Sequence, residues 1–169
     1  MVIRTHHCGS IKVDQIGSEV KVAGWVHRRR DHGGVIFFDL RDESGLVQVV
    51  FNPDDKENFL TAESCRNEYV LSAKGIVQER PEGTINPDLD TGKIEILGTE
   101  ITILNTSLPI PFQLDEYASV GEDTRLKYRF LDLRRLDMQQ NIRMRSNTSI
   151  SVRNFLNKNG FLEIETPLL

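Results

Sequence analysis

Cysteine is scarce in this chain, and its spacing excludes the sites that cysteine usually builds. The 169 residues include two cysteines, Cys8 and Cys65, and no CxxC pair. Structural zinc sites need closely spaced cysteines or histidines, and disulfide frameworks need several cysteines. His6 and His7 precede Cys8, but adjacent histidines near a terminus are typical of solvated polar residues. We therefore expect no metal site and no required disulfide, as suits a reducing cytosol.

Long apolar runs and an excess of positive charge are also missing. The aliphatic and aromatic runs are only a few residues long, and no basic segment followed by an apolar one opens the chain. We expect neither a membrane span nor a secretion signal, and hence a cytoplasmic protein. Lysine and arginine number 21 against 25 acidic residues, a net charge of -4. Proteins that coat DNA regardless of sequence depend on broad basic surface, so we expect no DNA partner, and any nucleic-acid site must be local.

Three short apolar runs stand between residues 22 and 51. Residues 19–26 alternate polar and apolar side chains, which is the period of a half-buried strand. If that alternation continued, Arg28 and Arg30 would be buried, and burying unpaired guanidinium groups costs too much. We therefore expect the strand to bend or bulge near residues 25–27, or its buried part to end there.

The strand and turn signals together predict a small barrel. Gly33 and Gly34 supply the backbone freedom for a hairpin turn, and the polar residues 42–45 form a second turn. The expected elements are strands at residues 19–26, 35–41, 46–51, 68–78 and 93–104, with one short helix between Pro53 and about Cys65. This order is that of the OB-fold, a five-stranded Greek-key barrel that binds oligonucleotides on the face of its second and third strands. We predict a mainly β fold of this kind in residues 1–105.

The rest of the chain has a different character. Residues 106–135 are rich in proline and charge and predict a linker or hinge. Asp137 and Gln140 have the spacing of a capping box, which would open a helix that Gly160 closes. Residues 161–166 alternate as a strand that stops at Pro167. Because nothing follows for that strand to pair with, residues 136–169 are expected to be the start of a truncated α+β domain.

Four blocks of sequence carry a resemblance to one family. They are GWVHRRRDHGGVIFFDLRDESGLVQVVF, the loop of residues 80–86, RLKYRFLDLRR and GFLEIETP. In this order they resemble the N-terminal third of a bacterial-type aspartyl-tRNA synthetase of class II. The resemblance implies an anticodon-binding OB domain, a hinge, and the helix and strand of the first class II motif, which ends at Pro167 and builds a homodimer interface.

The resemblance also implies an activity for the full-length protein. That enzyme would use ATP and Mg²⁺ to activate aspartate and would transfer it to tRNA-Asp. The aspartate and ATP sites of the family lie further along the chain, so the 169 residues are expected to bind tRNA but to hold no cofactor and to be inactive alone, with no catalytic residue.

Several residues are candidates for anticodon binding. Phe37 lies on the polar face of its strand, where an exposed ring can stack on a base. Gln48 can both donate to and accept from one base edge, as reading a uracil requires. The resemblance adds five positions near anticodon bases and backbone: Arg28, Arg30, Arg80, Asn86 and Glu95. Three of these residues have a plainer interpretation: Phe37 could be buried under a loop, and Gln48 and Glu95 could be solvated strand residues.

Two further positions bear on the choice of tRNA. His32 and Gly83 match the pattern of non-discriminating relatives, which charge both tRNA-Asp and tRNA-Asn. The two anticodons differ at the third base, so a small change in loop shape there could relax selectivity. Both residues could equally be plain turn residues.

Other interpretations stay open. The chain could be a free-standing OB-fold module that binds RNA, a dimerisation module built on residues 137–169, or part of the sister synthetase for asparagine or lysine. The basic connector at residues 125–135 could contact the tRNA backbone, or its apolar members could pack the hinge.

Overall fold

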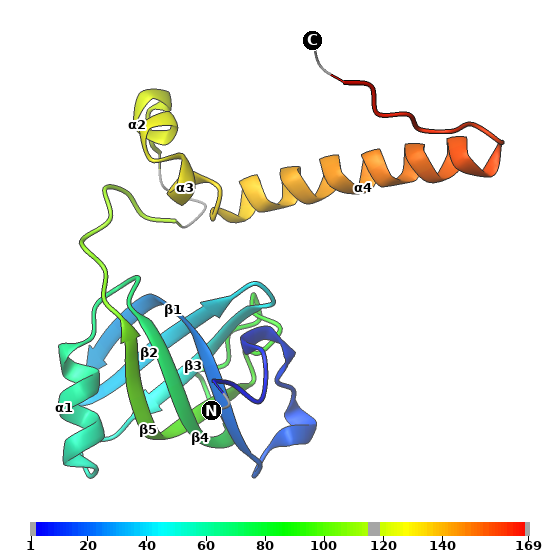
Figure 1. The fold of residues 1–169 in the computed structure, drawn as a ribbon. Coiled ribbons are helices and arrows are strands. Elements are labelled where there is room, and N and C mark those ends of the chain that lie inside the picture. The colour runs from blue at the N-terminus through cyan, green and yellow to red at the C-terminus, as the bar shows by residue number, and fades with distance from the viewer. Residues whose placement is uncertain (1–2, 115–118, 168–169) are drawn as a thin grey trace. The chain divides into compact units, whose positions relative to one another are not determined.

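Five strands close into a barrel in the first of two compact units. The computed structural model describes residues 3–114 and 119–167, and the chain divides into its units between Ile110 and Pro111. The strands are β1 (Glu19–His32), β2 (Val35–Asp42), β3 (Gly45–Phe51), β4 (Val70–Glu79) and β5 (Ile94–Asn105). Around the closed barrel they follow the order β1-β2-β3-β5-β4, with β3 and β5 parallel (Figure 1). The predicted OB-fold is confirmed.

Alternate residues of the strands fill the barrel. The largest fully buried side chains lie at every second position of each strand, as period two requires, and include Val22, Val26, Ile36, Phe38, Leu40, Val47, Phe51, Leu71, Ile94 and Ile96. Burying one such side chain contributes roughly 1.5–3 kcal/mol. The opposite faces of β2 and β3 carry the polar Asp39, Arg41 and Gln48 together with the apolar Phe37 and Val50.

β1 bulges where the cost of burying arginine predicts it. Val26 pairs with Leu40, but the next pair joins Arg28 to Asp39, so His27 is an extra residue in the strand. The hairpin that follows turns through Gly33 and Gly34, whose φ angles of 62° and 83° fit a turn of type I′.

The predicted short helix, α1 (Lys56–Ser64), joins β3 to β4. Asp55 is its N-cap, because its carboxylate accepts from the backbone N–H of Asn58 at 3.3 Å. Asn58 also ties the helix to β5, since its amide donates to the carbonyl of Thr99 and its oxygen accepts from the N–H of Ile101.

Two short 3₁₀ turns near the N-terminus, η1 (Cys8–Ser10) and η2 (Val13–Gln15), have no counterpart in the sequence prediction. The N–H of Cys8 donates to the carboxylate of Asp42 at 2.9 Å, and the N–H of Gly9 donates to the Ser44 hydroxyl at 2.7 Å. A Cβ on Gly9 would lie 2.2 Å from the carbonyl oxygen of Ser44, so only glycine permits this approach. The segment is thus fixed against the β2–β3 turn.

The second unit is helical. It contains α2 (Glu122–Lys127), α3 (Arg129–Asp132) and the long α4 (Leu136–Lys158). The first two lie inside the predicted linker, which is therefore less irregular than expected. No helix in residues 3–114 and 119–167 is both long and apolar enough to cross a bilayer.

The ends of α4 differ in how well they match the prediction. The expected capping box between Asp137 and Gln140 is wrong: the N-cap is Arg135, and no side chain caps it. The N-cap lies two residues before the predicted one, so Asp137 is inside the helix, and its carboxylate lies 3.3 Å from Nε of Arg135. At the other end Gly160 has a φ of 84°, and the N–H of Phe161 donates to Leu156, as in a Schellman motif. Gly160 therefore closes the helix as predicted.

The strand expected at residues 161–166 is not formed. These residues are exposed and belong to no sheet. A strand is stable only when its backbone groups pair with a neighbour, and no strand among the described residues pairs with this one.

Candidate nucleic-acid interface

The outward faces of β2 and β3 bring the candidate residues together. Phe37 and Asp39 point away from the core, opposite in parity to the buried Phe38. Asp39 pairs with Gln48 across the two strands, and Arg30 pairs with Phe37. Directly opposed residues share a face, so these side chains form one surface.

A chain of hydrogen bonds crosses all five strands on this surface. Nη2 of Arg30 donates to Oδ1 of Asp39 at 2.6 Å and to Oε1 of Gln48 at 3.1 Å. Nε2 of Gln48 donates to Oε2 of Glu95 at 2.7 Å, and Nε2 of Gln78 donates to Oε1 of Glu95 at 2.7 Å. We call Arg30, Asp39, Gln48, Gln78 and Glu95 the outer network.

Two members of the outer network are buried although they lie outside the core. Gln48 is 5% exposed and Glu95 is 4% exposed. Neither is a solvated strand residue, so that interpretation is wrong for both. Buried polar groups need partners, and here each polar side chain supplies the other's. The side chains are consequently held in one arrangement before any ligand arrives.

Arg80 lies beside the outer network with a donor to spare. It is 6% exposed, and its Nε donates to the carbonyl of Ile94 at 2.9 Å. Burial lowers its pKa, an effect that the carboxylates of Asp39 and Glu95 oppose. Nη2 of Arg80 and Nε of Arg30 are buried without a hydrogen-bond partner among the described residues. Unsatisfied buried donors cost roughly 1–3 kcal/mol each, so both favour a ligand with acceptor oxygens.

Phe37 is half-buried rather than covered, so it is not an aromatic residue hidden under a loop. The exposed His32 contacts it, with ring centroids 6.0 Å apart and planes at 62°. The rings of His32 and Phe37 therefore form a T-shaped pair.

The remaining arginines of β1 divide as their parity predicts. Arg28 is exposed and stands opposite Asp39 on the outer surface. Arg29 faces the other way, and its guanidinium lies 3.7 Å from the carboxylate of Asp31.

The loop between β4 and β5 has its own internal structure. The side-chain oxygen of Asn86 accepts from the N–H of Asp88 at 3.0 Å, so it is used within the loop. Thr84 donates to the carbonyl of Pro81, and Gly83 has a φ of 82° at the third position of this turn. A type II turn needs that conformation. Gly83 thus has a conformational cause in addition to any role in tRNA choice.

Sequence reasoning missed two members of the outer network as site residues. Asp39 shares the face of Phe37 by simple alternation, so the pattern alone could have identified it. Gln78 could not be found this way, because its contact with Glu95 depends on the β4–β5 register, which pairs these two residues.

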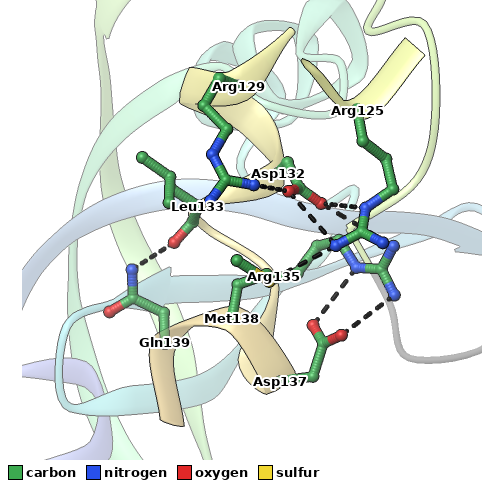
Figure 2. Close-up of polar contacts among 8 residues, drawn as sticks. All are labelled: Arg125, Arg129, Asp132, Leu133, Arg135, Asp137, Met138 and Gln139. Carbon is green, nitrogen blue, oxygen red and sulfur yellow. Dashed lines mark hydrogen bonds and ion pairs between the residues drawn. The ribbon is translucent and has the colours of Figure 1, made fainter. Parts of the chain in front are cut away.

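The basic connector of the second unit is organised around one carboxylate (Figure 2). Asp132 is fully buried and accepts from Nε of Arg125 at 2.8 Å and from Nη1 of Arg129 at 2.6 Å. Arg135 lies 4.0 Å away. The hydrogen bond from Arg125 and the surrounding positive charge lower the pKa of Asp132, although burial opposes this. These guanidinium groups are therefore engaged within the unit. We call these four residues the Asp132 cluster.

The two cysteines form no disulfide with each other. Cys8 and Cys65 are free and buried, and burial raises the pKa of the Cys65 thiol to about 11. Within the described ranges no group of three histidine, cysteine or acidic side chains is placed to hold a metal ion.

Comparison with known proteins agrees with this geometry. Residues 20–104 match the family model described as the OB-fold nucleic acid binding domain. The chain belongs to this family. Beyond its OB-fold nucleic acid binding domain, residues 121–169 match the model of class II tRNA synthetases (D, K and N).

Individual relatives of this OB-fold protein are synthetases. It is 54% identical over 166 residues to the aspartate–tRNA(Asp/Asn) ligase of Endomicrobium trichonymphae, covering 98% of this chain and 28% of the relative. The asparaginyl-tRNA synthetase of Pyrococcus horikoshii is 24% identical, with a TM-score of 0.82 over 98% of this chain and 38% of that one. The aspartyl-tRNA synthetase of Entamoeba histolytica is 23% identical, with a TM-score of 0.82 over 92% and 37%. These two structures show the fold, and the chain spans much less than half of each relative.

Proposed function

We propose that this chain is the anticodon-recognition part of an aminoacyl-tRNA synthetase that joins aspartate to tRNA-Asp and also to tRNA-Asn. The outer network carries the proposal, because it is a preorganised polar surface beside an accessible ring on the oligonucleotide face of an OB-fold. The relative at 54% identity bears the name of an aspartate–tRNA(Asp/Asn) ligase, which supports both substrates.

Each residue has a role that its chemistry supports. Phe37 stacks on the middle base, and Gln48 reads the edge of that base, a uracil. Arg28 and Arg30 contact bases and backbone, where a planar guanidinium suits both. Arg80, Asn86 and Glu95 surround the first base; a carboxylate there accepts from the N1 and N2 donors of guanine.

We further propose that the whole enzyme is a cytoplasmic homodimer that uses ATP and Mg²⁺. Residues 1–105 would form the anticodon-binding domain, 106–135 the hinge and 136–169 the start of the catalytic domain, with Pro167 in the dimer motif. The described residues supply no cluster for a divalent ion, so no step of the ATP chemistry is assigned to them.

The test of anticodon recognition uses short RNA hairpins and the 169-residue chain. Hairpins with the anticodons GUC and GUU should bind with similar affinity. One with adenine in the middle should bind at least roughly tenfold more weakly, because Arg30 and Glu95 hold the amide of Gln48 in one orientation and it cannot turn to match the adenine edge. Equal binding of all three hairpins would refute base recognition by this surface.

The test of tRNA choice uses the full-length enzyme and purified tRNAs. We expect tRNA-Asp and tRNA-Asn to be charged with comparable kcat/KM if His32 and Gly83 relax selectivity. Charging of tRNA-Asn that is hundreds of times less efficient would contradict that role while leaving anticodon binding intact.

A further inference from the structure

The bulge in β1 decides which face of the barrel carries two arginines. Before the bulge, Val26 pairs with Leu40 and points into the core. In an unbulged strand the next residue of the same parity, Arg28, would stand opposite the fully buried Phe38. The extra residue instead places Arg28 opposite Asp39, on the outer surface. Arg30 moves to that surface in the same way.

The backbone of the bulge is held by the segment that precedes β4. The N–H of Val26 donates to the carbonyl of Tyr69 at 2.8 Å, and the N–H of Glu68 donates to the carbonyl of Val26 at 2.7 Å. Glu68 has a φ of 65°, and among the described residues other than glycine no other has a positive φ. That conformation is uncommon for a residue with a side chain, so the surroundings must hold it.

Side chains reinforce the same point. The Glu68 carboxylate accepts twice from Nη2 of Arg41, at 2.9 and 3.1 Å, and its side chain is only 5% exposed. Nη1 of Arg41 lies 3.0 Å from Nδ1 of His27, the extra residue of the bulge. The guanidinium of Arg41 therefore joins His27 to Glu68, and the N–H of Glu68 in turn binds the carbonyl of Val26, next to His27. We call His27, Arg41 and Glu68 the bulge clamp.

We propose that Glu68 is a positioning residue for RNA binding, acting through the bulge clamp to keep Arg28 and Arg30 on the outer surface. The inference rests on the proposed function. A buried ion pair adds little stability compared with apolar residues of similar volume. Here the ion pair between Glu68 and Arg41 has a different effect. It fixes the β1–β2 register after the bulge, and the positions of Arg28 and Arg30 depend on that register.

The main experiment measures binding of the GUC hairpin by fluorescence anisotropy over a series of salt concentrations. Glu68→Gln should weaken binding roughly tenfold, as expected when the guanidinium groups no longer reach their acceptors on the RNA. It should also reduce the slope of log Kd against log salt, by about 0.7 for each phosphate that is no longer neutralised. A variant that only lowered stability would leave the slope of the folded chain unchanged.

A double-mutant cycle tests whether Glu68 acts through the arginines. Arg30→Ala should weaken binding on its own. If the bulge clamp works by placing Arg30, then Glu68→Gln should have a much smaller effect in the Arg30→Ala background than in the wild type. Strictly additive effects would mean that Glu68 does not act through Arg30.

Two further variants provide controls. Glu19→Gln also removes one negative charge, but at a position in β1 where the carboxylate lies 3.0 Å from Nζ of Lys74 and outside the bulge clamp. It should leave the affinity and the slope unchanged. Arg41→Lys keeps the charge but not the planar fork, and it should weaken binding in the same direction as Glu68→Gln. Circular dichroism identifies any variant that fails to fold, in which case the other clamp variant decides.

The outcomes separate this inference from the proposed function. If the wild type binds and Arg30→Ala weakens it, but both clamp variants behave like Glu19→Gln, the positioning role is wrong and the anticodon site stands. If the hairpin binds equally with any anticodon and Arg30→Ala has no effect, the proposed function fails and the positioning role fails with it.

Discussion

Glu95 is a carboxylate on a surface that we propose binds a polyanion, and its two partners explain how it is tolerated there. Both oxygens accept from amides, those of Gln48 and Gln78, each at 2.7 Å. The charge of this buried carboxylate is thus solvated by the two amides of the protein itself. A base with donors on its edge can replace one amide, whereas a base with acceptors cannot.

Replacing Glu95 with Gln should destabilise the barrel and weaken binding of hairpins whose first anticodon base is guanine. One of the two acceptor oxygens would become an NH₂ group facing another amide donor, which costs roughly 1–3 kcal/mol. Urea unfolding measures the first effect and anisotropy the second. Glu100→Gln, an exposed change on the same strand, should do neither. A Glu95→Gln variant as stable as Glu100→Gln would show that the amide contacts contribute nothing.

Phe37 offers a second test on the scale of one side chain. Phe37→Ala should weaken hairpin binding by roughly 1–3 kcal/mol, the size of one stacking interaction. Phe37→Tyr keeps the ring and should bind like the wild type. Because the ring is only half-buried, the stability of the chain should fall less than for the buried Phe38→Ala. Unchanged affinity for Phe37→Ala would remove the ring from the site.

The elements show which features a sequence can predict. The cost of burying Arg28 predicted the bulge near His27, and the two adjacent glycines predicted the turn at Gly33. Both features depend on local chemistry. The outer network joins five strands, and its Gln78–Glu95 contact depends on a register set by the whole barrel. The capping box failed because the helix begins at Leu136, so Asp137 lies within its first turn rather than at the N-cap.

The Asp132 cluster in the second unit should be sensitive to acid. The folded state holds the pKa of Asp132 below its ordinary value, chiefly through the hydrogen bond from Arg125. Its stabilisation is therefore fully present above about pH 4 and is lost as the pH falls through the lowered pKa. NMR spectra of residues 122–135 between about pH 6 and 2 should show α2 and α3 losing structure in that window.

A matched pair of variants checks the assignment to Asp132. Asp132→Asn should disturb the same resonances already at pH 6, because the amide cannot satisfy the surrounding guanidinium groups. Asp123→Asn, an exposed change in α2, should leave both the spectrum and the acid transition as in the wild type. An acid transition that survives in Asp132→Asn would assign it to a different carboxyl group.

On the scale of the whole molecule, charge is arranged locally. The chain carries a net charge of -4, yet Arg28, Arg30 and Arg80 lie on or beside one surface of the barrel. Long-range attraction for RNA is therefore weak, and affinity must come from a few positioned groups. The proposed interface consequently differs from that of a protein that coats nucleic acid by charge alone.

The salt dependence of hairpin binding should reflect this arrangement. If three arginines neutralise loop phosphates, the slope of log Kd against log salt should be about 2, since each phosphate neutralised on a single strand contributes about 0.7. A hairpin with an altered middle base keeps its phosphate interactions and loses only the interaction of that base with the protein. Its plot should lie above that of the GUC hairpin and run parallel to it, because the difference in affinity does not depend on salt. A slope near zero would exclude phosphate binding, and plots that converge at high salt would mean that charge rather than the outer network distinguishes the two RNAs.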